Sequence, residues 1–143
     1  MPTGPLRIKD ILQKTTQFFR DKGIESARLD SELLISSALN WERVKLYLNY
    51  DYPLTNDELA ICREYVRRRA AGEPVAYILG KKDFYRHSFI VSPAVLIPRP
   101  ETELLVETAV NWLRDHVEEG ARFVDLGTGS GCIGLSIAHE IEN

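Results

Sequence analysis

The chain has 143 residues, of which 44% are hydrophobic and 27% charged, and its formal net charge is −3. This composition is typical of a folded globular protein, and it argues against a disordered chain and against a general nucleic-acid-binding surface. Cys62 and Cys132 are isolated, so neither a disulfide framework nor a zinc site is predicted. The sequence has no apolar run of membrane-spanning length and no signal peptide, which predicts a cytoplasmic protein without a membrane partner.

The first half of the chain has apolar residues at helical spacing and predicts a compact bundle of four helices. Gly23 is placed to end the first helix, Ser26 to cap the second and Gly72 to end the fourth. Thr55 and Glu58 have the spacing of a capping box at the start of the fourth helix. The third helix is expected over residues 42–49. The predicted apolar stripes of the second and third helices comprise Leu29, Leu33, Leu34, Ala38, Trp41, Val44 and Leu48.

Positive charge gathers at the end of the fourth predicted helix, in Arg63, Arg67, Arg68 and Arg69. One interpretation is a docking patch for an acidic partner or for RNA. The other is a solvated helix end, where cations suit the helix dipole, and this is the commoner arrangement.

Residues 73–94 have a different composition and predict a linker that contains a small β-hairpin. Its expected strands are Phe84-Tyr85 and Phe89–Val91. Upstream of them, Pro74 can begin a short turn. The predicted organisation is therefore a helical domain over residues 1–72, this linker, and the start of a further domain over residues 95–143.

Arg99 lies between Pro98 and Pro100, and the two prolines restrict the backbone on both sides of it. Pro100 can begin a helix with Glu101 and Glu103 in its first turn, where acidic residues suit the dipole. An arginine held in this way indicates a functional role, and the alternative is a structural ion pair with one of the two glutamates. The buried stripe expected for this helix is Leu104, Leu105, Thr108, Ala109, Trp112 and Leu113.

The C-terminal segment predicts a strand, a glycine-rich turn and a helix in succession. Phe123–Leu126 is typical of a short buried strand, and Ile133–Ala138 of an apolar helix. Between them, Gly127, Gly129 and Gly131 stand at alternate positions, where side chains would obstruct a tight turn. Because free backbone N–H groups converge at a helix N-terminus, this segment predicts a ligand cradle. A glycine-rich turn without a ligand is the alternative.

The spacing of the glycines bears on the ligand. The dinucleotide fingerprint is G-x-G-x-x-G, whereas Asp125 with Gly127, Gly129 and Gly131 gives D-x-G-x-G-x-G. This form resembles motif I of the S-adenosylmethionine-dependent methyltransferases of the Rossmann-like class. A doubly wound sheet needs several more strands. The predicted fold is therefore an α-helical bundle, a β-hairpin linker and only the first helix–strand–helix of a Rossmann-like α/β domain. Because the strand would lack its neighbours, we expect residues 121–143 to pack poorly.

Three blocks of sequence together resemble the release-factor glutamine methyltransferases, the HemK/PrmC family: Gly72–Gly80, Val95–Glu103 and Asp125–Gly131. The resemblance covers the whole chain. It implies transfer of a methyl group from S-adenosylmethionine to the side-chain amide nitrogen of the glutamine in the Gly-Gly-Gln motif of peptide chain release factors. It also implies that residues 1–72 recognise this protein substrate, and that no nucleic acid is bound directly.

The resemblance further implies which residues bind the cofactor. The backbone would approach the cofactor closely at Gly127, Gly129 and Gly131, and backbone N–H groups would come from Thr128 and Ser130. Asp125 would lie near the methionine ammonium. Arg99 and Thr102 would lie across the pocket, near the methionyl end.

The family's catalytic motif, Asn-Pro-Pro-Tyr, does not occur in these 143 residues. Because an amide nitrogen is a poor nucleophile, the reaction depends on the polar acceptors of that motif to orient it. We therefore expect no catalytic residue here, no activity from this chain alone, and a longer parent enzyme. The alternative hypothesis is a protein-binding helical module attached to a fragment of a nicotinamide-dependent oxidoreductase, which the glycine spacing disfavours.

Overall fold

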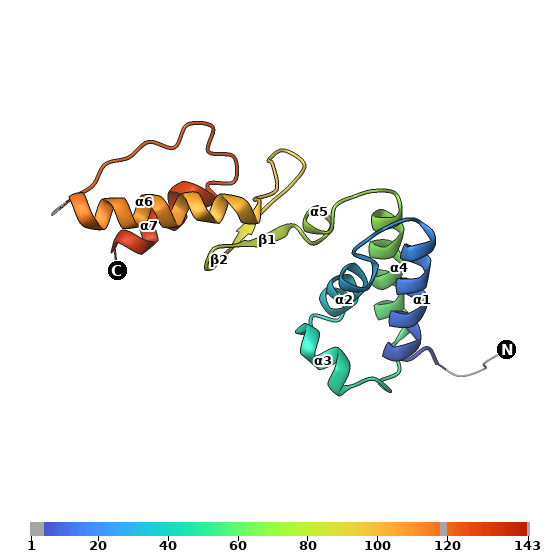
Figure 1. Cartoon of the computed structure of the whole chain (residues 1–143). Coiled ribbons are helices and arrows are strands. Elements are labelled where there is room, and N and C mark those ends of the chain that lie inside the picture. The colour runs from blue at the N-terminus through green and yellow to red at the C-terminus, as the bar shows by residue number, and fades with distance from the viewer. Residues whose placement is uncertain (1–4, 118–119, 143) are drawn as a thin grey trace. The chain divides into compact units, whose positions relative to one another are not determined.

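The computed structural model describes residues 5–117 and 120–142, and the chain divides into two compact units. The N-terminal unit comprises residues 1–79 and the C-terminal unit residues 80–143. Figure 1 shows that the N-terminal unit is mostly helical, whereas the C-terminal unit combines a hairpin, helices and long loops. Among the described helices, none combines the length and the apolar character that a membrane span requires. The domain boundaries predicted after residues 72 and 94 stay predictions.

The N-terminal unit is a helical bundle, as predicted, in which α2 is the central element. This helix packs against all the other helices of the unit (Figure 1). A short fifth helix occurs where only a turn beginning at Pro74 was expected. The helices are α1 (Ile8–Asp21), α2 (Ala27–Ala38), α3 (Arg43–Leu48), α4 (Asn56–Ala70) and α5 (Val75–Leu79).

Local sequence signals define several helix ends. The Glu58 N–H donates to the Thr55 hydroxyl over 3.3 Å, and the Thr55 N–H donates to the Glu58 carboxylate over 2.7 Å, so the predicted capping box is confirmed. Gly23 follows α1 with φ +75° and donates its N–H to the carbonyl of Arg20. Ser26 precedes α2 as expected, but its side chain forms no capping hydrogen bond.

Two clusters of buried side chains form the core of the N-terminal unit. Each fully buried Leu, Ile or Phe stabilises the fold by about 1.5–3 kcal/mol relative to an exposed one. The larger cluster comprises Ile8, Ile11, Leu12, Ile35, Leu39, Leu46, Leu54, Leu59 and Cys62. The smaller cluster comprises Phe19, Ala27, Leu34 and Ile78.

The predicted apolar stripes of α2 and α3 are partly wrong. Leu29, Val44 and Leu48 were expected inside, yet they are 45%, 57% and 78% exposed. In α3 the buried position is Leu46 instead, so a different face of this short helix packs on α2. Because α2 is surrounded, it also buries polar residues such as Ser31, whose hydroxyl donates to a backbone carbonyl one turn earlier.

The C-terminal unit contains a two-stranded antiparallel sheet and two longer helices. The predicted hairpin is confirmed, but its strands are shifted, with Tyr85 in the turn at φ +55°. The register pairs Lys81 with Ile90 and Phe84 with His87. The elements are β1 (Lys81–Phe84), β2 (His87–Ile90), the 3-10 helix η1 (Pro100–Thr102), α6 (Glu103–His116) and α7 (Cys132–Glu142).

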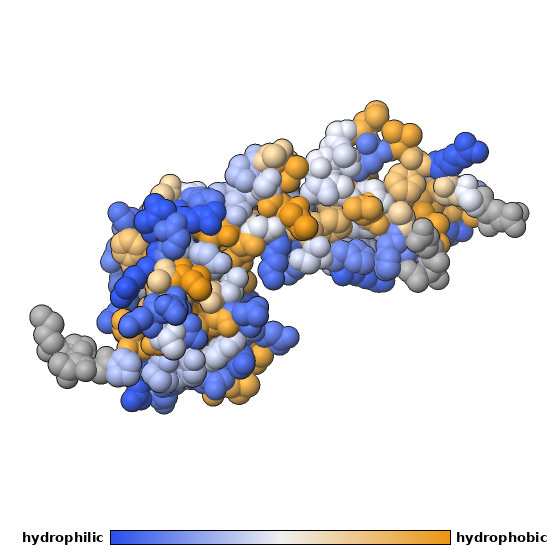
Figure 2. All heavy atoms as spheres, turned by 180° about the vertical axis from the view of Figure 1, so that it is seen from behind, coloured by the Kyte–Doolittle hydropathy of each residue, from blue (hydrophilic) through white to orange (hydrophobic). Residues whose placement is uncertain are grey.

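The hairpin, α6 and α7 share one apolar core. Val106 and Val110 supply the buried face of α6. The predicted stripe is wrong for Leu104, Leu105 and Trp112, which are 68%, 54% and 56% exposed. Figure 2 shows hydrophobic residues at the surface of this unit. The core residues are Phe84, Phe89, Val106, Val110, Cys132 and Ile137.

The strand predicted at Phe123–Leu126 does not form. This segment is a loop in which Val124 is 81% and Leu126 89% exposed. A parallel strand is buried between neighbours, and the described residues contain no strand that pairs with this one. The expected poor packing therefore holds for the loop but is wrong for α7, where Ser136 and Ile137 are buried.

Candidate functional site

The glycine-rich turn before α7 contains three residues with left-handed backbone. The φ angle is +74° at Gly127, +57° at Gly129 and +78° at Gly131, values that residues with a Cβ rarely adopt. Steric crowding is not the reason for the first two, because a Cβ on Gly127 would meet no atom within 4 Å and one on Gly129 only a carbonyl oxygen at 3.9 Å. Both Cα atoms therefore border open space, where a ligand can approach the backbone. Ser130, in the same turn, is half-buried.

Asp125 is held at the N-terminus of α7 by two hydrogen bonds. The Thr128 hydroxyl donates to Oδ2 over 3.0 Å, and the Gly134 N–H donates to the same oxygen over 3.2 Å. The helix dipole favours a carboxylate in this position. Within the described residues Oδ1 accepts no hydrogen bond. This oxygen can therefore accept from a cationic ligand group.

Gly134 is a residue of this site that the sequence reasoning missed. A Cβ at this position would lie 3.2 Å from Oδ2 of Asp125 and 3.7 Å from the ring of Phe123. Glycine thus allows α7 to approach the Asp125 segment closely. The signal was present, because Gly129, Gly131 and Gly134 have the G-x-G-x-x-G spacing, whose third glycine serves close helix packing. The spacing argument against a nicotinamide cofactor is therefore wrong, since both fingerprints occur in the segment from the turn to the start of α7.

Arg99 precedes η1 and Thr102 is its last residue. The Thr102 N–H donates to the Arg99 carbonyl over 3.1 Å, and Arg99 is extended, as expected for a residue before proline. Within the described residues, Arg99 forms no ion pair with Glu101 or Glu103, so the structural alternative for this arginine is not realised. Glu103 instead accepts the N–H of Tyr85 over 2.9 Å. No hydrogen bond or ion pair in the described part of the chain joins Arg99 or Thr102 to the glycine-rich turn.

The arginines of α4 are mostly neutralised by carboxylates. Three of the four form ion pairs, and the hydrogen bonds from two of these arginines hold the pKa values of Glu64 and Glu73 below their usual range. This arrangement supports the structural interpretation of these three residues over a docking patch. The pairs are Arg67–Glu64, Arg68–Glu73 and Arg69–Asp30.

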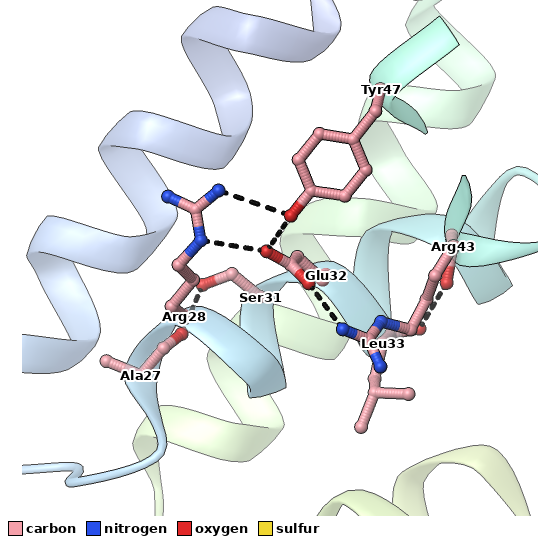
Figure 3. A network of polar contacts seen from close by, with 8 residues as sticks. Ala27, Arg28, Ser31, Glu32, Leu33, Arg43 and Tyr47 are labelled. Atoms are coloured by element: carbon pink, nitrogen blue, oxygen red, sulfur yellow. Dashed lines mark hydrogen bonds and ion pairs between the residues drawn. The ribbon is translucent and has the colours of Figure 1, made fainter. Parts of the chain in front are cut away.

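Glu32 of α2 is a buried carboxylate bonded to three side chains (Figure 3). It accepts hydrogen bonds from Arg28 over 3.0 Å, from Arg43 over 2.8 Å and from the hydroxyl of Tyr47, while its side chain is only 5% exposed. Burial acts to raise the pKa of Glu32, but the hydrogen bonds from Tyr47 and Arg43 outweigh it and lower that pKa. Because every partner is a side chain of α2 or α3, this network braces two helices and does not form a reactive site.

No group of three or more His, Cys, Asp and Glu in the described residues has an arrangement that could hold a metal ion. Burial, the larger effect, and the nearby charge of Glu58 raise the pKa of the Cys62 thiol to about 11. A thiol of this kind is a core residue and not a nucleophile.

Comparison with known proteins identifies relatives along nearly the whole chain. Residues 10–80 match the family described as the PrmC N-terminal domain. The chain is 45% identical over 134 residues to the release factor glutamine methyltransferase of Geobacter sulfurreducens, an alignment that covers 94% of this chain and 46% of that protein. Identity to the protein of the same name from Leptospira interrogans is 44% over 133 residues, covering 93% and 46%. For that of Rhodopirellula baltica it is 40% over 139 residues, covering 96% and 47%. The chain thus spans about half the length of the curated relatives it matches.

Proposed function

The chain belongs to the family of release factor glutamine methyltransferases, and we propose that it supplies the helical domain and the first cofactor-binding unit of such an enzyme. The enzyme transfers a methyl group from S-adenosylmethionine to the side-chain amide nitrogen of the glutamine in the Gly-Gly-Gln motif of peptide chain release factors. Its release factor substrate is recognised through residues 1–72, in the cytoplasm. The C-terminal unit begins a Rossmann-like α/β domain, in which Phe123–Leu126 becomes a strand once neighbouring strands pair with it.

The observation that carries this proposal is the position of Asp125 beside the glycine-rich turn. The open side of Gly127 and Gly129 admits a ligand to the backbone, and Oδ1 of Asp125 remains to accept from it. S-adenosylmethionine has an ammonium and a sulfonium group, and a carboxylate suits both charges. Backbone N–H groups at Thr128 and Ser130 complement its polar atoms. When bound, the cofactor supplies an electrophilic methyl group.

Arg99 and Thr102 border the methionyl end of the cofactor in this proposal. The hydrogen bond between them sets the start of η1 and leaves the exposed Arg99 guanidinium without an ion-pair partner among the described residues. A guanidinium matches the geometry of a carboxylate, such as that of a methionyl group. The two residues thereby orient the cofactor and take no part in bond formation.

Methyl transfer to an amide needs a group that holds the amide N–H atoms and aims the nitrogen at the methyl carbon. The family's Asn-Pro-Pro-Tyr motif has this role, and it is not among the residues of this chain. The 143 residues alone therefore bind and position but do not catalyse.

Mass spectrometry of a methylation reaction tests the proposed function. The full-length protein that contains this chain is incubated with S-adenosylmethionine and a purified release factor, and one methyl group is expected on the glutamine of the Gly-Gly-Gln peptide. A release factor with alanine at that glutamine is the control and gains none. Calorimetric titration with NAD in parallel addresses the oxidoreductase alternative. Methylation that persists on the alanine control, or binding of NAD in place of S-adenosylmethionine, contradicts the proposal.

A further inference from the structure

A groove of about 550 Å³ lies between α1 and α4. Both helices pack on α2, and side chains from each line the groove. We call it the α1–α4 groove. Its floor is apolar, with Phe18 41% exposed and Cys62 fully buried beneath it. The apolar lining residues include Leu6, Ile11, Phe18, Leu59, Val66 and Ala70.

The rim of the α1–α4 groove is basic. Lys14 and Lys22 of the α1 side face Arg63 and Arg67 of α4, and no carboxylate is among the residues that line the groove. Arg67 pairs with the exposed Glu64 outside the lining, and Lys22 lies 5.8 Å from the ring centre of Phe18. Within the described residues, Lys14 and Arg63 form no ion pair. In a chain of net charge −3, this surface concentrates positive charge around an apolar floor.

The walls of the groove have the length and spacing that suit a third helix. Along α1 the lining residues recur on one helical face from Ile11 to Lys22, the residue after its end, and along α4 from Leu59 to Ala70. Each wall therefore extends over roughly 17 Å, or about three helical turns. An apolar groove between two helices is the setting in which amphipathic helices dock, through apolar residues three and four positions apart.

We propose that the α1–α4 groove docks an acidic amphipathic helix of a partner protein. Apolar side chains of that helix cover Phe18 and Val66, and its Asp or Glu residues face Lys14 and Arg63. The absence of acidic residues from the lining selects against a basic helix, because like charges would oppose across the groove. The proposal concerns protein docking and does not depend on the methyl transfer proposed above.

A second copy of the chain is the competing occupant, because α6 exposes Leu104 and Trp112 beside Glu107. Sedimentation of the full chain at several concentrations examines this alternative. We expect a monomer. A dimer that the double variant Lys14→Glu with Arg63→Glu disrupts would overturn the proposal of a partner protein.

Fluorescence anisotropy tests the docking directly. The probe is a labelled designed helix of about 16 residues with Leu at positions i, i+3, i+4 and i+7 and Glu on its other faces. Two control peptides replace every Glu by Lys or scramble the Leu positions. With the full chain, the acidic helix is expected to bind at least about tenfold more tightly than either control. Equal binding of the acidic and the basic peptide would overturn the proposal.

Charge reversal locates the binding. The double variant Lys14→Glu with Arg63→Glu is expected to weaken binding by at least about tenfold, whereas Arg20→Glu, on α1 but outside the groove, changes it by less than about twofold. Circular dichroism verifies that each variant is folded. Should the double variant unfold, chemical shifts of the wild-type chain decide. Shifts on peptide addition are expected at Val66 and Ala70, and shifts confined to the C-terminal unit would contradict the proposal.

Discussion

The backbone N–H of Gly134 donates to Oδ2 of Asp125 over 3.2 Å, and a Cβ at Gly134 would lie at that same distance from the same oxygen. The first turn of α7 and the carboxylate therefore determine one another's position. The Thr128 hydroxyl donates to the same oxygen over 3.0 Å. The carboxylate that we assign to the cofactor ammonium thus depends on a glycine that lies outside the turn.

Replacing Gly134 by alanine is expected to separate cofactor binding from stability. The new Cβ displaces the Asp125 carboxylate, so the affinity of the full-length enzyme for S-adenosylmethionine falls by about tenfold. Alanine is the better helix former by about 1 kcal/mol, which offsets the strain in the free energy of unfolding. Calorimetric titration and thermal melts provide the two measurements. Ser136→Ala, also on α7, is the matched control and leaves the affinity unchanged. An unaltered affinity in Gly134→Ala would show that Asp125 does not bind the cofactor.

Replacing Gly129 by valine is expected to abolish S-adenosylmethionine binding in the full-length enzyme. The φ angle of +57° at this position is strongly unfavourable for a β-branched residue. The side chain would also occupy the open space through which a ligand approaches. Titration of the purified variant, after circular dichroism has verified its helix content, gives the result. Retained binding would mean that the cofactor does not approach this part of the turn.

The 143 residues on their own are expected to bind S-adenosylmethionine at least roughly a hundredfold more weakly than the longer parent enzyme does. By resemblance to the family, an acidic residue that is not among these 143 residues would hold the ribose of the cofactor. Losing one charged hydrogen bond costs about 1.5–3 kcal/mol, and losing the far wall of the pocket adds to this cost. Each 1.4 kcal/mol is about tenfold in affinity. Titration of both proteins under one set of conditions makes the comparison. Equal affinities would show that these 143 residues build the complete pocket.

Replacing Glu32 by glutamine is expected to lower the free energy of unfolding by about 1–3 kcal/mol, because it removes a charge-assisted brace whose partners stay in place. Urea denaturation of the full chain followed by circular dichroism measures the loss. The matched control is Glu64→Gln, which removes an exposed pair with Arg67 and is expected to destabilise the chain much less than Glu32→Gln does. An equal loss in the free energy of unfolding for the two variants would show that the burial of Glu32 does not increase its contribution to stability.

The stability of the chain is expected to fall in acid, with Glu32 as one cause. The pKa of Glu32 in the folded chain lies below its usual value of 4.5. A carboxylate with a lowered pKa contributes stability that is fully present above 4.5 and is lost as the pH falls toward its folded-state pKa. Unfolding of the wild type and of Glu32→Gln is compared at pH values from about 7 down to about 3. The free energy of unfolding of Glu32→Gln should change less with pH than that of the wild type. An equal change in both would show that Glu32 does not cause the loss of stability in acid.

The features that the sequence predicted correctly depend on hydrogen bonds between near neighbours. The capping box of Thr55 and Glu58 spans three residues, and Gly23 ends α1 through its own left-handed backbone. Such contacts are decided within one helical turn, so the residue types indicate them directly.

The predictions that failed concern contacts between distant segments. Leu48 and Leu104 are exposed because α3 and α6 pack through other faces, on which Leu46 and Val106 are buried. The expected strand at Phe123–Leu126 needs hydrogen-bonding partners that local sequence does not supply. The glycine spacing at the site could be predicted, whereas the contact of Gly134 with a carboxylate nine residues earlier follows only from how α7 packs.

The bracing of α3 by Glu32 also has a consequence for how the N-terminal unit opens. A helix of six residues is unstable by itself, and Leu46 is its one fully buried side chain among those described. Arg43 and Tyr47, one turn apart, both reach the same carboxylate on α2. Local fraying of α3 would therefore remove two of the three partners of a buried carboxylate and leave it only Arg28 of α2. The amides of α3 are expected to exchange with solvent only when α2 unfolds. Although α3 has only six residues, it then belongs to the same cooperative unit as α2.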